Sequence, residues 1–234
     1  MHDFLCALRQ RAQEIVDLAD KTETAFKSVD QTVAGDIFIG CGETQGMRVI
    51  IGAMKKLSEA HTDIRFHLYS GNGEDVSKRL EKGLVDFGLF VGNTNLDKFD
   101  YVKLPVYDTW GLLMRNDAPL ANRETIRPKD LEDITLLCSR QALTNNELSG
   151  WLGKDFSKLN ILSTHNLLYN ASLMVEEGMG YALAIDGLVN TSERNLVFRP
   201  FEPKIKADLV FAWKKYQVFS KASELLLNYL QKNL

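Results

Sequence analysis

A regular alternation of short apolar segments with amphipathic segments runs through residues 36–92. Residues 36–41 (DIFIGC), 64–69 (IRFHLY) and 85–92 (VDFGLFVG) have the pattern of strands, and the segments between them repeat apolar residues at helical spacing. Strand–helix–strand units of this kind build a parallel sheet with right-handed crossovers. The third strand is apolar almost throughout, which predicts a sheet covered on both faces.

The rest of the chain repeats this alternation, so the predicted fold class is α/β with two similar units. Residues 101–106 and 109–115 predict two extended runs, and residues 130–138 begin the second unit. Further expected elements are helices at 145–152 and 166–177, strands at 181–185 and 207–213, and a last helix that Ser220 caps. Gly83 is placed to end the helix that carries Val76 and Leu80.

The first 35 residues differ from the rest and predict a separate helix. Its apolar side chains form a narrow stripe close to a seven-residue repeat: Phe4, Leu8, Ile15, Leu18, Thr22 and Val29. Such a stripe is typical of a coiled-coil seam that pairs two chains. Thr22 and Arg11 interrupt the seam, so a helix that packs on its own domain is the alternative.

Composition excludes several classes of protein. Lys and Arg total 28 against 31 Asp and Glu, a net charge of −3, whereas a domain that binds DNA directly usually has a basic surplus. The N-terminus lacks the apolar core of a signal peptide, and no stretch approaches the roughly 18 apolar residues of a membrane span. We therefore expect a cytoplasmic protein that does not bind membranes.

No catalytic, metal or cofactor motif stands out. The four histidines and three cysteines lack metal-ligand spacing, and neither a GxSxG nor a GxxxxGK[ST] motif is present. The run GCGETQG (40–46) has the wrong spacing for a dinucleotide-binding loop. We expect no enzyme activity, no metal and no cofactor.

Polar residues follow the first two strands, where an open parallel sheet binds ligands. Glu43, Thr44 and Gln45 follow the first strand, and residues 71–73 (Gly71, Asn72 and Gly73) follow the second. Each group precedes a helix, and helix N-termini attract anions and polar groups. These residues predict a site for a small anionic or polar ligand. Ordinary strand-to-helix turns with capping residues remain the alternative.

Four motifs in order resemble the effector-binding domain of LysR-type transcriptional regulators. The resemblance covers essentially the whole chain, including residues 9–18, which look like that family's linker helix. The matching positions are Leu80, Gly83, Asp86 and Gly88, then Pro119, Leu120, Ala121, Ile126, Asp130 and Leu131, then Gly178 and Gly180, then the segment 196–230. Thr62 departs from the pattern, since the family usually has proline there. The family's N-terminal winged helix-turn-helix is missing, so we expect DNA contact only through a domain absent from this chain.

The resemblance implies a fold like that of type II periplasmic binding proteins. It would consist of a linker helix (1–35) and two Rossmann-like subdomains (36–109 plus 208–234, and 110–207) joined by two crossover strands. An effector would bind in the cleft between the subdomains.

The resemblance also implies which residues bind the effector. To the residues after the first two strands it adds Val91, Ser139, Arg140, Gln141, His165, Asn166 and Ile185. At the position of Ile185 the family often has another pattern. Arg140 could grip a carboxylate in bidentate fashion, or it could be a surface arginine that pairs with Glu43 or Glu147. Cys41 and Cys138 are inert core residues or, as the less favoured alternative, a redox switch.

Together these features predict the effector-binding and oligomerisation domain of a LysR-type regulator. It would sense a small acidic or polar metabolite, form a homodimer or homotetramer, and control transcription through the absent DNA-binding domain. The alternative is a solute-binding protein of the same fold that serves a transporter.

Overall fold

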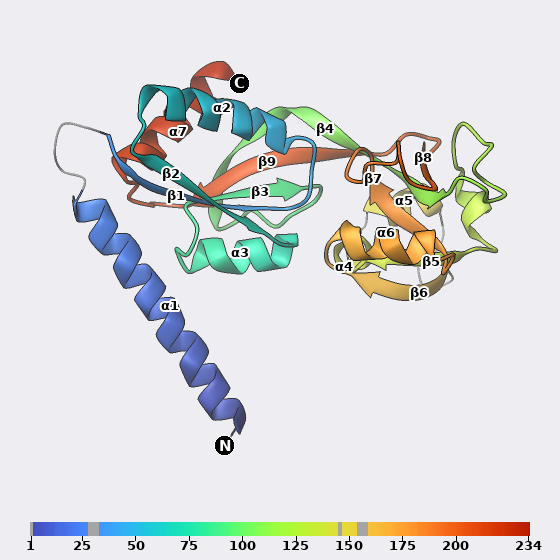
Figure 1. Cartoon of the computed structure of the whole chain (residues 1–234), viewed down its shortest axis with the longest axis horizontal. Helices are drawn as coiled ribbons and strands as arrows, with labels where there is room; N and C mark the ends of the chain where they lie inside the picture. Colours follow the sequence, from blue (N-terminus) through green and yellow to red (C-terminus); the bar gives the residue numbers. More distant parts are fainter. Residues whose placement is uncertain (1, 28–32, 145–146, 154–158) are drawn as a thin grey trace.

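One continuous sheet forms the centre of the molecule (Figure 1). The structure, a computed structural model, describes residues 2–27, 33–144, 147–153 and 159–234. The strand order is β2-β1-β3-β9-β4-β7-β5-β6, and β8 pairs with β4. The strands are β1 (Gly35–Cys41), β2 (Ile64–Ser70), β3 (Phe87–Val91), β4 (Phe99–Arg115), β5 (Thr135–Ser139), β6 (Asn160–His165), β7 (Tyr181–Ile185), β8 (Leu196–Pro200) and β9 (Lys206–Lys214).

Strands β1, β2 and β3 form what we call the first half of the sheet. Strand β1 pairs in parallel with both β2 and β3, which confirms the parallel sheet that the strand–helix alternation predicts. Apolar side chains of β1 and β3 pack on one face against α2 (Met47–Ala60) and α7 (Lys221–Asn233). On the other face, Val76 and Leu80 of α3 (Gly73–Glu81) pack against Phe90. Both faces are covered, as the apolar third strand predicts.

Strands β5 to β8 form the second half, which has the same plan. Strand β5 pairs in parallel with β6 and β7. One face packs against α4 (Arg140–Thr144), α5 (Glu147–Leu152) and the 3-10 helix η1 (Pro128–Leu131), and the other against α6 (Leu168–Glu176). The fold class is therefore the predicted α/β class, with two similar units.

Two long antiparallel strands join the halves. Strand β9 pairs with β3, and β4 pairs with β9 from Phe99 to Thr109 and then with β7 and β8. Both runs predicted between residues 101 and 115 are extended, but they are not separate strands, because β4 is one strand of 17 residues. Pro105 lies where the β4–β9 register shifts, between Lys103 and Tyr107. The shift lets β4 pass a residue that has no N–H to donate.

Other local predictions are confirmed or corrected. Ser220 caps α7, since its Oγ accepts a hydrogen bond from Ser223 N at 3.2 Å, and Gly83 follows α3 with a φ of +73°. Helix α6 begins at Leu168 rather than at residue 166. The helix expected at 145–152 is α5, which begins at residue 147, while residues 145–146 lie outside the described part. The sequence patterns missed β6 and β8.

Helix α1 (His2–Lys27) projects away from the sheet (Figure 1). Its contacts with the rest of the chain include an ion pair from Lys82 to Glu14 and the approach of Leu18 to Gly83. The apolar side chains of the predicted seam are exposed, with Phe4 at 71% and Ile15 at 68%. Val29 and the Thr22 side chain lie outside the described residues. None of the helices in the described ranges has the length and apolarity needed to cross a membrane.

Gly111 in β4 lies where two strands approach closely. A Cβ atom there would lie 2.3 Å from the backbone oxygen of Arg199 and 2.3 Å from the Phe198 ring, whereas a Cβ on Gly52 in α2 would meet nothing within 4 Å. We expect Gly111→Ala to lower the free energy of unfolding by about 1–3 kcal/mol. Gly52→Ala should raise it by about 0.5–1 kcal/mol. Urea unfolding of both variants checks this, and equal stability of the two would contradict it.

Asp86 is a buried carboxylate, 5% exposed, that ties β3 to β1. Its Oδ2 accepts a hydrogen bond from Phe38 N at 2.9 Å, and its own N–H donates to Phe38 O at 2.7 Å. Asp86→Ala leaves the Phe38 N–H without its acceptor, so we expect a loss of about 1–3 kcal/mol in unfolding free energy. The exposed Asp133 is the matched control, and Asp133→Ala should change stability by less than about 0.5 kcal/mol. A stable Asp86→Ala protein in the same denaturation assay would exclude this structural role.

Candidate functional site

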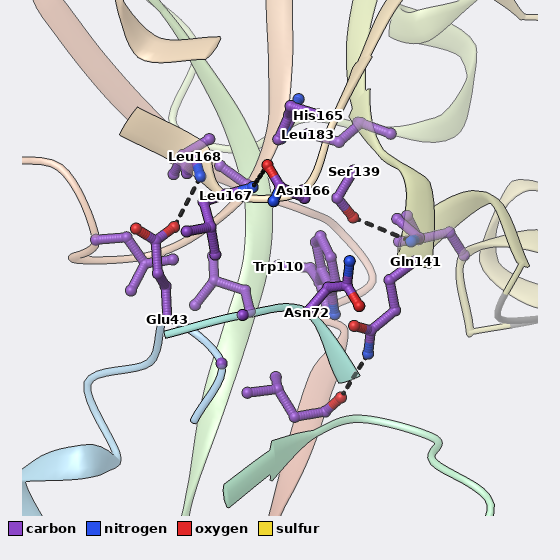
Figure 2. Close-up of a pocket in the computed structure, with 18 residues that line it drawn as sticks. Glu43, Asn72, Trp110, Ser139, Gln141, His165, Asn166, Leu167, Leu168 and Leu183 are labelled. Atoms are coloured by element: carbon purple, nitrogen blue, oxygen red, sulfur yellow. Dashed lines mark hydrogen bonds between the residues drawn. The ribbon is translucent and has the colours of Figure 1, made fainter. Parts of the chain in front are cut away.

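A cavity of about 90 Å³ lies where the carboxyl ends of the parallel strands of the two halves face each other (Figure 2). This location is where open α/β sheets bind ligands. The residues that line it are Gly42, Glu43, Gly71, Asn72, Val91, Trp110, Ser139, Gln141, Ala142, Leu148, His165, Asn166, Leu167, Leu168, Leu183, Ala184, Ile185 and Leu188.

Most of the sequence-predicted site residues meet in this lining, and they come from both halves. The first half contributes Glu43, Gly71, Asn72 and Val91, and the second contributes Ser139, Gln141, His165, Asn166 and Ile185. Each one ends a strand or follows one closely, because that edge of each half faces the other. Thr44, Gln45, Gly73 and Arg140 do not belong to the lining.

Glu43 reaches across the cavity to a helix of the other half. Its Oε2 accepts a hydrogen bond from Leu168 N, the first residue of α6, at 2.7 Å (Figure 2). No side chain from α6's own N-cap, Leu167, caps the helix. The carboxylate therefore satisfies an N–H group that the helix leaves open and lies at the positive end of its dipole.

Gln141 makes the reverse connection, from α4 of the second half to the first half. Its Oε1 accepts a hydrogen bond from Gly73 N at 2.9 Å, and its Nε2 donates to Val91 O at 3.3 Å. Gly73 thus acts through its backbone: it begins α3 and donates to Gln141. Gln141 itself belongs to the cavity lining.

Gln45 and Thr44 lie next to Glu43 in the chain but outside the cavity lining. Gln45 Nε2 donates to Gly187 O in the second half, a third connection between the halves. Thr44 Oγ1 accepts a hydrogen bond from Gly46 N at 2.9 Å, and the hydroxyl also hydrogen-bonds the buried carboxyl of Asp108. Burial raises the pKa of Asp108, and the bond from Thr44 opposes that rise.

Arg140 points into a different hollow. That hollow, next to the cavity, has a polar lining that also includes Glu74 and Ser77, and it shares Asn72 and Gln141 with the cavity wall. At the start of α4, Gln141 thus lines both spaces, whereas Arg140 lines only the hollow.

The cavity itself has few charges. Glu43 is its one acidic residue, and neither Lys nor Arg occurs among the lining residues. Burial lowers the pKa of the His165 imidazole, which favours the neutral form at pH 7. Most of the remaining lining side chains are apolar.

The two candidate redox cysteines are buried and end facing strands, Cys41 in β1 and Cys138 in β5. Burial raises the pKa of Cys41 and raises that of Cys138 to about 12. Thiolate formation is thereby suppressed, which favours the inert-core interpretation. Within the described ranges no three His, Cys, Asp or Glu side chains gather as a metal ion would require.

Sequence patterns missed half of the lining. Trp110 and the leucines at 148, 167, 168, 183 and 188 line the cavity, together with the small residues Gly42, Ala142 and Ala184. In the sequence, polar groups at strand ends and the family resemblance indicated the site. An apolar side chain next to a cavity has the same pattern as one in the core.

Comparisons with known proteins identify the family of this chain. Residues 30–234 match the family model described as LysR substrate binding domain. The chain is 19% identical over 217 residues to the uncharacterized HTH-type transcriptional regulator YvbU of Bacillus subtilis, covering 92% of this chain and 73% of that protein. It is 23% identical over 122 residues to the uncharacterized HTH-type transcriptional regulator MJ0300 of Methanocaldococcus jannaschii, covering 52% of this chain and 40% of that protein.

Two solved structures share the fold. One is the effector binding domain of QuiR in complex with shikimate, with a TM-score of 0.71 at 16% identity, covering 86% of this chain and 97% of that one. The other is full-length CbnR complexed with its target DNA, with a TM-score of 0.72 at 12% identity, covering 97% of this chain and 80% of that one. Since the family model matches most of its length, the chain belongs to the LysR substrate-binding domain family.

Proposed function

We propose that the chain binds its effector in the cavity between the two halves of the sheet. Its family provides the general role, which is to sense an effector as part of a transcriptional regulator. The observation that carries the proposal is the meeting of both sets of strand ends around one cavity. The ligand contacts are the nine predicted residues of the lining, together with Trp110. The related QuiR domain, whose structure contains shikimate, supports a small-molecule ligand.

Effector binding changes the balance between open and closed arrangements of the halves. We assign the halves to subdomains 36–109 plus 208–234 and 110–207. This division is supported by the pairing of β4, which pairs with β9 up to Thr109 and with β7 from Trp110 onward. Glu43, Gln45 and Gln141 each connect one subdomain with the other and stabilise the closed form. A ligand that binds the closed form more tightly shifts the population toward it.

The change in balance is transmitted to DNA through α1 and a DNA-binding domain outside this chain. The exposed apolar stripe of α1 is the surface through which two copies pair. The structure of full-length CbnR with its target DNA supports a link between this fold and a DNA-binding part.

Filling the cavity should abolish effector binding. A Cβ on Gly42 would lie 3.5 Å from Val91 Cγ2 and 4.0 Å from Gly71 O, both in the lining, and these are ordinary contacts. In a thermal-shift screen of metabolites, a ligand at 100 times its Kd adds about 2.7 kcal/mol, so we expect a rise of roughly 5–10 °C in Tm. Gly42→Leu should remove this shift.

Gly52→Leu is the matched control, because it adds the same side chain on the open face of α2 and should keep the shift. Gly42→Ala, with no atom beyond Cβ, verifies that this backbone position tolerates a side chain. A ligand that shifts wild type and Gly42→Leu equally binds elsewhere, and the proposal would be wrong.

Pairing through α1 should depend on its apolar stripe. We expect a dimer or tetramer in sedimentation velocity at micromolar concentration. Replacing Leu8 and Ile15 by Ser should raise the dissociation constant by at least about tenfold, because both side chains lose burial in the seam. Arg9→Ser, between the seam positions, should have little effect. A wild-type monomer at these concentrations would rule out this pairing.

A further inference from the structure

The cavity offers an anionic ligand no positive partner. Glu43 lies in the lining, and its Oε2 already accepts the first N–H of α6 at 2.7 Å. A helix N-terminus is a ready site for a carboxylate, but in this arrangement the protein's own carboxylate occupies it. Arg140 lines the neighbouring hollow with Glu74, outside the cavity.

What the lining leaves for a ligand is mainly hydrogen-bond donors. Trp110 is 9% exposed, and its Nε1–H has no acceptor among the described residues. Asn72 and Ser139 use their oxygens internally, since Asn72 Oδ1 accepts from Asp75 N and Ser139 Oγ accepts from Ala142 N. The Asn72 amide N–H groups and the Ser139 hydroxyl hydrogen therefore remain to act as donors. Figure 2 shows the Trp110 ring among the side chains that surround the cavity.

The rest of the cavity lining is mainly apolar. Val91, Leu183, Ile185 and Leu188 form part of the lining. The volume of about 90 Å³ lies below the roughly 300–1,000 Å³ of pockets for drug-sized ligands. Burial keeps the His165 imidazole neutral, so His165 adds no positive charge. A cavity of this kind suits a compact molecule with an apolar body.

We infer that the effector is an uncharged, compact molecule whose carbonyl or hydroxyl oxygen accepts a hydrogen bond from Trp110. This inference rests on the proposed function, because it concerns the ligand of the same cavity. A carboxylate would lie near Glu43 with no cation to offset the repulsion. An ammonium group would lose its water in a mainly apolar site, where its one anionic partner, Glu43, already accepts the first N–H of α6. Of the two classes that the sequence leaves open, acidic and polar, the geometry favours the polar one.

Three probes with one ring and different charges test this inference: benzamide, benzoate and benzylamine. In ¹H–¹⁵N spectra the chain has three indole N–H signals, from Trp110, Trp151 and Trp213, which the three Trp→Phe variants assign. We expect benzamide to shift the Trp110 signal and to bind at least about tenfold more tightly than either charged probe. Trp151 is the internal control, since its Nε1 is also buried without a partner but lies outside the cavity lining.

The hydrogen bond is tested separately from the shape of the site. Trp110→Phe keeps an aromatic ring but removes the donor, so benzamide should bind about three- to tenfold more weakly. Toluene, which has no acceptor, should bind the variant and the wild type with similar affinity. Trp151→Phe should leave both affinities unchanged.

Several outcomes would overturn the inference. Benzoate or benzylamine binding as tightly as benzamide, with the Trp110 signal shifted, would show that the cavity accepts a charge. No shift of Trp110 by any probe up to about 20 mM, where weak fragment binding still registers, would also refute it. In either case, an effector from the thermal-shift screen that binds the wild type but not Gly42→Leu would still support the proposed function. An effector that shifts the Tm of the wild type and of Gly42→Leu equally would refute the proposed function itself.

Discussion

The antiparallel pairing of β4 with β9 is the constraint on which the rest of the structure depends. These two strands carry the backbone between the halves, with register pairs from Phe99–Lys214 to Thr109–Lys206. Their register sets how the carboxyl ends of β1, β2 and β3 face those of β5, β6 and β7. The cavity exists because both parallel sets point their ligand-binding edges at the same space. The irregularity around Pro105 lies within this pair, so the connection between the halves contains its own break in regular pairing.

The halves also complete each other's backbone hydrogen bonding. Glu43 of the first half supplies the acceptor that α6 lacks, and Gln141 of the second half serves Gly73 N and Val91 O. Backbone groups at helix and strand ends require partners, and here the partners come from across the cavity. Opening the cleft would expose these groups to water, which can replace the lost bonds. Each of these bonds exchanges with a bond to water, so together they contribute only a small net free energy.

The strands and most helices follow from the sequence because burial imposes clear periodicity on them. The edge strand β6 escaped detection since its side chains alternate between exposed and half-buried positions and leave little apolar signal. Glu43 and Asn72 were found because polar residues follow the first two strands, and His165 was found through the family resemblance. Arg140 and Gln141 could not be separated, because adjacent helical residues differ in direction by about 100° and only the folded chain shows which one meets the cavity. Trp110 was missed because an apolar side chain beside a cavity has the same pattern as one in the core.

The family motif and the ligand site reside in different residues. Leu80 is fully buried, Gly83 has a φ of +73°, and Asp86 holds Phe38. A Cβ on Gly88 would lie 2.7 Å from the Phe90 ring, so close packing explains this glycine. These four motif residues therefore maintain the first half of the sheet, and none of them lines the cavity. In the first half, the residues that carry the family resemblance are thus separate from those that line the cavity.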